Sequence, residues 1–176
     1  MRLSFLLSAA ALTLAVSAPA SATVFLFGTN LSSAGEPVPT SPATGIASVS
    51  FDDASLNVSV TETFANLVNP ASASHLHCCT AVAGAGSASV LLGFAGFPSS
   101  TSDTYTNTFL LSQAAFDTLL AGVQAGKAYV NIHSPGTYAA GEIRGFLAPV
   151  PEPTTYALLL SGLGLVGWMV RRRQQA

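Results

Sequence analysis

The chain has 176 residues, of which 49% are hydrophobic and only 8% are charged. The apolar residues are concentrated at the two ends, so this average does not indicate a membrane protein throughout. The segment between the ends, residues 23–149, has the length of one ordinary domain. It contains two basic and seven acidic residues, a net charge of −5, which excludes nucleic-acid binding because that needs a basic surface.

The N-terminal segment, residues 1–22, has the layout of a cleaved secretory signal. A basic residue precedes an apolar run over 3–16, which is followed by small residues. Ala20 and Ala22 stand at the A-x-A spacing that a signal peptidase recognises. We therefore expect a signal helix that is removed by cleavage between Ala22 and Thr23; a retained N-terminal anchor is the alternative.

From residue 23 to residue 149 the sequence mostly alternates apolar and polar residues, which is typical of strands with one buried face. The runs 46–51 and 56–60 alternate on either side of a turn at Asp52-Asp53 and predict a hairpin. Further strands are expected at 24–27, 74–77, 87–94, 104–110, 128–133 and 142–147. We expect a mostly β fold, an antiparallel β-sandwich of immunoglobulin-like or superoxide-dismutase-like type.

One segment departs from this alternation and predicts a short helix over 112–125. Ser112 is suited to cap a helix at its N-terminus, and Gly126 is suited to end one. Apolar residues follow the cap at helical spacing: Phe116, Leu119, Leu120 and Val123. We expect this helix to cross between strands.

The C-terminal segment, residues 150–176, has three parts. Pro151, Glu152 and Pro153 form an extended stretch, because proline does not enter the interior of a regular element. An uncharged run over 154–170 follows, at the short limit of what spans a bilayer as a helix. It ends in a cytoplasmic stop formed by Arg171, Arg172 and Arg173. We expect a transmembrane helix at 154–170; a buried core helix is the alternative.

This order of parts resembles the PEP-CTERM sorting signal of Gram-negative, biofilm-forming bacteria. The resemblance implies that an exosortase, a membrane protease-transpeptidase, recognises Pro151-Glu152-Pro153 and removes the tail. The protein would then be anchored only transiently in the inner membrane before it reaches the outer envelope or the extracellular matrix. A permanent single-pass anchor is the competing interpretation.

The three histidines are the most informative residues of the domain. His75 and His77 are separated by one residue, so a strand places both imidazoles on the same face. If the strands that carry them pair with the later ones, His133 and Glu142 join them in one polar patch. Imidazole suits zinc and copper, which makes His75, His77 and His133 candidate metal ligands. A hydrogen-bonded polar network without metal is the alternative.

The same stretches resemble the CHRD (chordin-type) domain. Residues 129–134 with 141–145 are similar to its closing signature, Ser74-His75-Leu76-His77 to its central element, and Pro42-Ala43-Thr44-Gly45 to its opening. The resemblance spans roughly residues 23–147 and implies a domain of extracellular proteins without an established catalytic role. His-x-His on a sandwich strand is also similar to the copper-zinc superoxide dismutases, an analogy of fold and motif fragment only.

Cys78 and Cys79 stand where the CHRD family commonly has a Gly-Pro turn. The Cα atoms of adjacent residues lie about 3.8 Å apart, below the usual range for a disulfide, so a bond between them would be strained. A redox-labile vicinal disulfide, free thiols, intermolecular bridges and metal thiolates all stay open at this point.

The sequence has no carboxylate dyad, no Ser/His/Asp spacing and no phosphate-binding glycine loop. We therefore expect no catalytic residues, no enzyme activity and no cofactor. We expect an exported, exosortase-sorted envelope or matrix protein whose domain binds a partner, with an extracellular polysaccharide or a surface protein as candidates. The alternative is a metal-binding, redox-related envelope protein with copper or zinc at the histidines.

Overall fold

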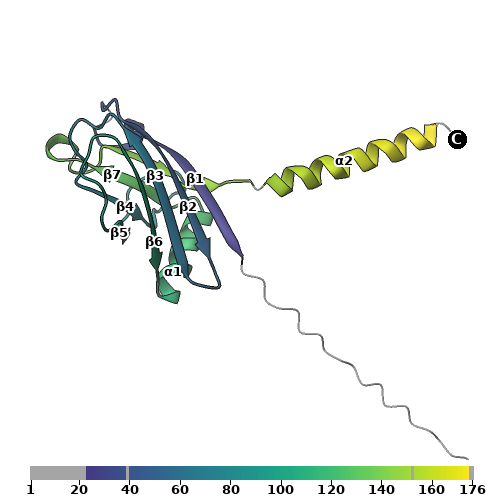
Figure 1. The fold of residues 1–176 in the computed structure, drawn as a ribbon, viewed down its shortest axis with the longest axis horizontal. Helices are drawn as coiled ribbons and strands as arrows, with labels where there is room; N and C mark the ends of the chain where they lie inside the picture. Colours follow the sequence, from purple (N-terminus) through teal and green to yellow (C-terminus); the bar gives the residue numbers. More distant parts are fainter. Residues whose placement is uncertain (1–22, 39, 152, 175–176) are drawn as a thin grey trace, which may run out of the picture.

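Nine strands form one antiparallel sheet in the computed structural model, which describes residues 23–38, 40–151 and 153–174 (Figure 1). In chain order the strands are β1 (Val24–Ser32), β2 (Thr44–Asp52), β3 (Asn57–Ala65), β4 (Ala73–His77), β5 (Val90–Gly93), β6 (Asp103–Leu110), β7 (Tyr129–His133), β8 (Ile143–Phe146) and β9 (Ala148–Pro149). The spatial order is β5-β4-β7-β8-β1-β2-β3-β6, and β9 pairs with β1. The mostly β, antiparallel fold expected from the sequence is confirmed.

The sheet curls so that its two halves enclose one hydrophobic core. The halves meet where β1 pairs with β8, with Ser32 opposite Arg144. Val60 on β3 and Leu76 on β4, from opposite halves, are both fully buried in the same apolar cluster. The two layers of the expected sandwich are therefore parts of one continuous sheet.

The hairpin of β2 and β3 follows the predicted alternation and is longer than expected. The paired residues run from Asp52 opposite Asn57 to Thr44 opposite Ala65. Val49 and Val58 point into the core, while the residues between the buried ones are Ser and Thr on the outer face. The alternation in fact continues through the threonines of β3, which favours extending the strand.

The expected helix is present as α1 (Gln113–Gln124). The Ser112 side chain accepts a hydrogen bond from the backbone N–H of Ala115, and Gly126 follows the helix with a φ of 67°. Phe116 packs edge-on against Phe51 of β2, with ring centroids 5.7 Å apart. The helix thus covers one end of the core, because its apolar side faces the sheet.

The expected strand over 87–94 is shorter than predicted, since only Val90–Gly93 pair with β4. The register shifts between Leu76 and His77, and residues before Val90 leave the sheet. The short 3₁₀ helices η1 (Ser33–Gly35) and η2 (Gly136–Tyr138) lie in other loops. These non-sheet segments lie near the histidines, as described below.

The C-terminal helix α2 (Pro153–Gln174) extends away from the sheet (Figure 1). In the described part of the chain, no helix is both long and apolar enough to cross a membrane. The predicted signal segment, including Ala20 and Ala22, lies outside the described residues.

Candidate functional site

The antiparallel pair of β4 and β7 places all three histidines on one face of the sheet. His75 and His77 alternate with Leu76, which points into the core. In the register of the pair, His75 lies opposite Asn131, and Ala73 lies opposite His133. His133 is therefore the diagonal neighbour of His75, at a distance that imidazole side chains can bridge.

The imidazole rings converge on a common centre. His75, His77 and His133 each have a ring nitrogen that lies within 4.8 Å of a ring nitrogen of both other histidines. The ring centroids of His75 and His133 are 4.9 Å apart. The centroid of His77 lies 5.7 Å from that of His75 and 6.1 Å from that of His133. The structure thus brings together the three residues that the sequence predicted as candidate ligands.

Two backbone carbonyls fix the orientation of two of these rings. Nδ1 of His77 lies 2.8 Å from the carbonyl oxygen of Ala88, and Nδ1 of His133 lies 3.0 Å from that of Ala139. A carbonyl oxygen only accepts, so each Nδ1 carries the proton and donates it. The Nε2 atoms of His77 and His133 are consequently acceptors with a free lone pair.

The inward nitrogens of the cluster are buried without a hydrogen-bond partner. They are Nδ1 of His75 and the Nε2 atoms of His77 and His133. Burial lowers the pKa of all three imidazoles below the ordinary value, and charge on the neighbouring histidines lowers the pKa of His75 further. The cluster is therefore held as neutral imidazoles, the form that binds metal ions.

Tyr129 and Arg144 form a layer behind His77 that the sequence did not reveal. The Tyr129 ring stacks on His77 with a centroid distance of 4.7 Å and an interplanar angle of 1°. The Arg144 guanidinium carbon lies 5.1 Å from the centroid of the Tyr129 ring. The Tyr129 hydroxyl also accepts from the N–H of Ala88, 3.3 Å away, so the residue whose carbonyl orients His77 is itself held in place.

Glu36 connects this layer to the loop after η1. It accepts a hydrogen bond from the Asn131 side chain, and the Arg144 Nε lies 3.9 Å from its carboxylate. Burial raises the pKa of Glu36 to about 7, although the positive charge of Arg144 lowers it in part. The loop is thus fastened to the face of the sheet that carries the histidines.

Glu142 does not join the histidines, contrary to the expectation of a four-residue patch. It is fully buried and accepts hydrogen bonds from the hydroxyl of Ser41 at 2.6 Å, from the N–H of Val68 at 2.7 Å and from the hydroxyl of Ser134. The physical reason is that Glu142 precedes β8 and faces three loops, which it holds together. Its role is therefore to satisfy buried donors.

Cys78 and Cys79 are joined in a disulfide at the end of β4. Both sulfurs lie next to the carbonyl oxygen of Thr118 on α1, at 4.0 and 3.8 Å. The pair packs against Gly122 of the same helix, where a Cβ atom would overlap both sulfurs. Of the four states that the sequence left open, the structure has the intramolecular disulfide, which contacts α1.

A second candidate site lies on the outer face of β1, β2, β3 and β6. Three cross-strand hydroxyl pairs join β3 to β6: Ser59 with Thr108 at 2.8 Å, Thr61 with Thr106 at 3.3 Å, and Thr63 with Thr104 at 3.0 Å. We call these six residues the hydroxyl ladder. It is solvent-facing and contains no charged side chain.

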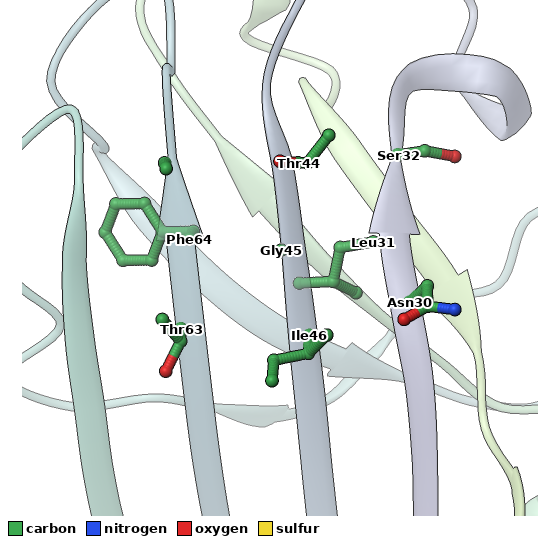
Figure 2. Close-up of a pocket in the computed structure, with 9 residues that line it drawn as sticks. Asn30, Leu31, Ser32, Thr44, Gly45, Ile46, Thr63 and Phe64 are labelled. Atoms are coloured by element: carbon green, nitrogen blue, oxygen red, sulfur yellow. The ribbon is translucent and has the colours of Figure 1, made fainter.

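Next to the hydroxyl ladder, the sheet is hollowed around Gly45 by a pocket of about 510 Å³. Figure 2 shows the lining side chains on three neighbouring strands, with Asn30, Ser32, Thr44, Ile46 and Thr63 around Gly45. Leu31, Phe64 and Ala65 complete the lining. None of these nine residues is charged, and Ile46 is 58% exposed. The hollow therefore offers neutral polar groups beside an apolar surface.

The sorting residues Pro151 and Pro153 lie where the sheet ends and α2 begins. Pro151 is exposed in the connection after β9, Glu152 lies outside the described residues, and Pro153 begins α2. Arg171, Arg172 and Arg173 are exposed in the last turn of α2.

The residue that follows the predicted signal cleavage, Thr23, is the first described residue. It is exposed and donates its N–H to the Asp53 carboxylate at 2.8 Å.

Comparison with protein families gives two matches. Residues 27–147, more than two thirds of the chain, match the CHRD domain, and residues 149–173 match the PEP-CTERM protein-sorting motif. Both resemblances noted in the sequence are therefore confirmed. Among curated proteins no relative matches, and among solved structures no similar fold matches.

Proposed function

Because the chain belongs to the CHRD domain family and carries a PEP-CTERM sorting motif, we propose that it is a non-enzymatic protein that binds extracellular polysaccharide. The sorting motif indicates export by the membrane-bound exosortase route to the cell surface. Both matched families are non-catalytic sorting and interaction families, which is compatible with a binding role. The proposed partner is a neutral polysaccharide on the outer face of the sheet.

The observation that carries this proposal is the uncharged, hydroxyl-rich surface made by the hydroxyl ladder and the adjoining hollow. Each Ser or Thr hydroxyl both donates and accepts, as do the hydroxyls of a sugar. The hollow adds an apolar surface, chiefly the exposed Ile46, beside polar groups such as Asn30. A pyranose ring has the same two kinds of surface, apolar C–H groups and a hydroxyl rim.

Charge favours a neutral polymer over a charged one. The segment 23–149 has a net charge of −5, which repels anionic polymers. A cationic partner would need acidic groups at the contact, and neither the hydroxyl ladder nor the hollow contains one. A polymer of neutral sugars meets no such electrostatic cost on this face.

Co-sedimentation of the full chain with cellulose, a neutral glucan, tests the proposal, with the anionic polymer alginate as comparison. We expect binding to cellulose and none to alginate. The double variant Thr61→Val with Thr63→Val removes two hydroxyls but keeps β-branched side chains suited to a strand. We expect it to bind roughly tenfold or more weakly, since each lost hydrogen bond contributes on the order of 1 kcal/mol.

Thr118→Val is the matched control, because Thr118 is an exposed threonine on α1 and lies outside this face. We expect it to bind cellulose as the parent chain does. Equal binding by the double variant and the parent would contradict the proposed surface. Binding to neither polymer, together with capture of a purified surface protein, would show that the partner is a protein.

A further inference from the structure

We propose that His75, His77 and His133 bind one zinc or copper ion, through Nδ1 of His75 and Nε2 of the other two. This site goes beyond polysaccharide binding and is independent of it, because the histidines belong to β4 and β7 and not to β1, β2, β3 or β6. Three observations support it: the rings converge, hydrogen bonds fix the tautomers of His77 and His133, and each ring has a buried nitrogen without a partner.

The inward nitrogens need a partner that the protein does not supply. Each of the three rings has a nitrogen within 4.8 Å of one in both of the others, and each has a buried nitrogen without a hydrogen bond. A buried acceptor that is left unpaired costs about 1–3 kcal/mol. Two such acceptors, the Nε2 atoms of His77 and His133, together with the unpaired Nδ1 of His75 therefore represent a substantial cost unless a bound species satisfies them.

A single water molecule has two hydrogens, so it can satisfy the Nε2 atoms of His77 and His133 together with His75 only if Nδ1 of His75 carries its own proton and donates to the water. One cation, in contrast, accepts the lone pairs of all three nitrogens at once.

The surroundings of the rings match those of metal-bound histidines. In such sites the second ring nitrogen donates to a carbonyl or carboxylate, which fixes the tautomer and orients the ring. The Nδ1 atoms of His77 and His133 do this with the carbonyls of Ala88 and Ala139. Tyr129 stacked on His77 restricts that ring further. The ligands are thus oriented before an ion arrives.

The donor set selects the class of ion. Three neutral imidazoles suit zinc and copper, whereas calcium and magnesium prefer carboxylate and carbonyl oxygens. The group of candidate ligands among the described residues contains no carboxylate, and Cys78 and Cys79 are bound to each other. By the general order of stability for divalent ions, copper(II) should bind more tightly than zinc.

Metal analysis of the purified full chain tests the site. The protein is freed of metal with a chelator, equilibrated separately with Zn²⁺ and Cu²⁺, passed through a desalting column and measured by mass spectrometry of its metal content. We expect one ion per chain, a higher thermal unfolding midpoint with metal, and a Cu²⁺ paramagnetic resonance spectrum with coupling to nitrogen ligands. Binding of the ion to the folded state alone is what raises the midpoint.

Variants locate the ion. His77→Ala should weaken binding by more than about 100-fold, because loss of a ligand exceeds the effect of losing an outer partner. Circular dichroism checks that this variant folds, and His75→Gln is the second variant because His75 is less buried. Asp117→Asn, an exposed carboxylate on α1, controls for surface binding and should bind as the parent does.

Two results would overturn the proposal. One is a parent chain that retains neither ion after desalting. The other is unchanged stoichiometry and affinity in both folded histidine variants, which would place the ion elsewhere. Neither result bears on cellulose binding, so failure of this site and failure of the proposed function are distinguishable.

Discussion

Glu62 is fully buried in the core on β3, where the hydroxyl of Ser74 lies 3.1 and 3.0 Å from its two carboxyl oxygens. Burial raises its pKa to about 8, and the hydrogen bond from Ser74 offsets only part of this effect. The folded protein therefore holds a proton on Glu62 at pH values where the unfolded chain has released it. This difference makes the free energy of unfolding depend on pH.

We predict that Glu62→Gln removes a large part of the loss of stability that occurs as the pH rises from about 4.5 to about 8. The ordinary pKa is 4.5 and the folded value is about 8, so the stabilisation from the bound proton is fully present below pH 4.5. It is lost as the pH rises to about 8, by at most about 1.4 kcal/mol per pH unit. Glutamine keeps the shape and cannot ionise, so the variant should be more stable than the parent at pH 9.

Urea unfolding of parent and variant at pH 5 and pH 9 checks this prediction. Glu36, whose pKa is raised to about 7, contributes to the pH dependence in the same direction and is unchanged in both proteins. The two proteins should therefore differ more at pH 9 than at pH 5. Parallel stability curves between these pH values would mean that Glu62 is ionised in the folded protein.

At the scale of elements, Gly122 sets how closely α1 approaches the end of β4. Glycine in a helix interior is usually about 1 kcal/mol less favourable than alanine. Here a Cβ atom would overlap the sulfurs of Cys78 and Cys79, so the glycine is required by packing. The helix and the disulfide therefore fit together only because position 122 lacks a side chain.

We predict that Gly122→Ala destabilises the protein by about 1–3 kcal/mol, the usual cost of overpacking. In a background with Cys78→Ala and Cys79→Ala the clash is absent, and the same substitution should be neutral or stabilise by up to about 1 kcal/mol. Denaturant unfolding of the four proteins measures the coupling between the helix and the disulfide. Equal effects of Gly122→Ala in both backgrounds would show that the disulfide does not set this contact.

Local sequence pattern predicted most of the elements because each depends on nearby residues. The alternation in β2 and β3 and the cap at Ser112 were sufficient to place the hairpin and α1. The pattern could not predict that residues 87–89 leave the sheet, because that follows from a register shift beside His77 on another strand.

The candidate site was predictable only in part for the same reason. Single-residue spacing put His75 and His77 on one face, and His133 joined them once β4 and β7 paired. The partners of Glu142 come from Ser41 and Val68, which are distant in sequence, so its separate position required the fold. The groups that orient His77 and His133 are backbone carbonyls of alanines, so no residue type in the sequence indicates them.

At the scale of the whole molecule, the domain and the tail have different tasks. The sheet presents the hydroxyl ladder and the histidines on the segment matched to the CHRD domain, and α2 lies beyond it within the sorting motif (Figure 1). Pro151 is exposed in the connection between them, where a protease can reach it. Removal of α2 would therefore leave the folded sheet without loss of a core element.

Central to this account is delivery of the domain to the cell surface by processing at both ends. The most direct test is the intact mass of the protein recovered from the extracellular fraction of cells that have an active exosortase. We predict a chain that begins at Thr23 and lacks the helix α2, and we predict retention of α2 in a Pro151→Ala, Pro153→Ala variant. An extracellular protein that keeps α2, with the same mass in parent and variant, would contradict the account.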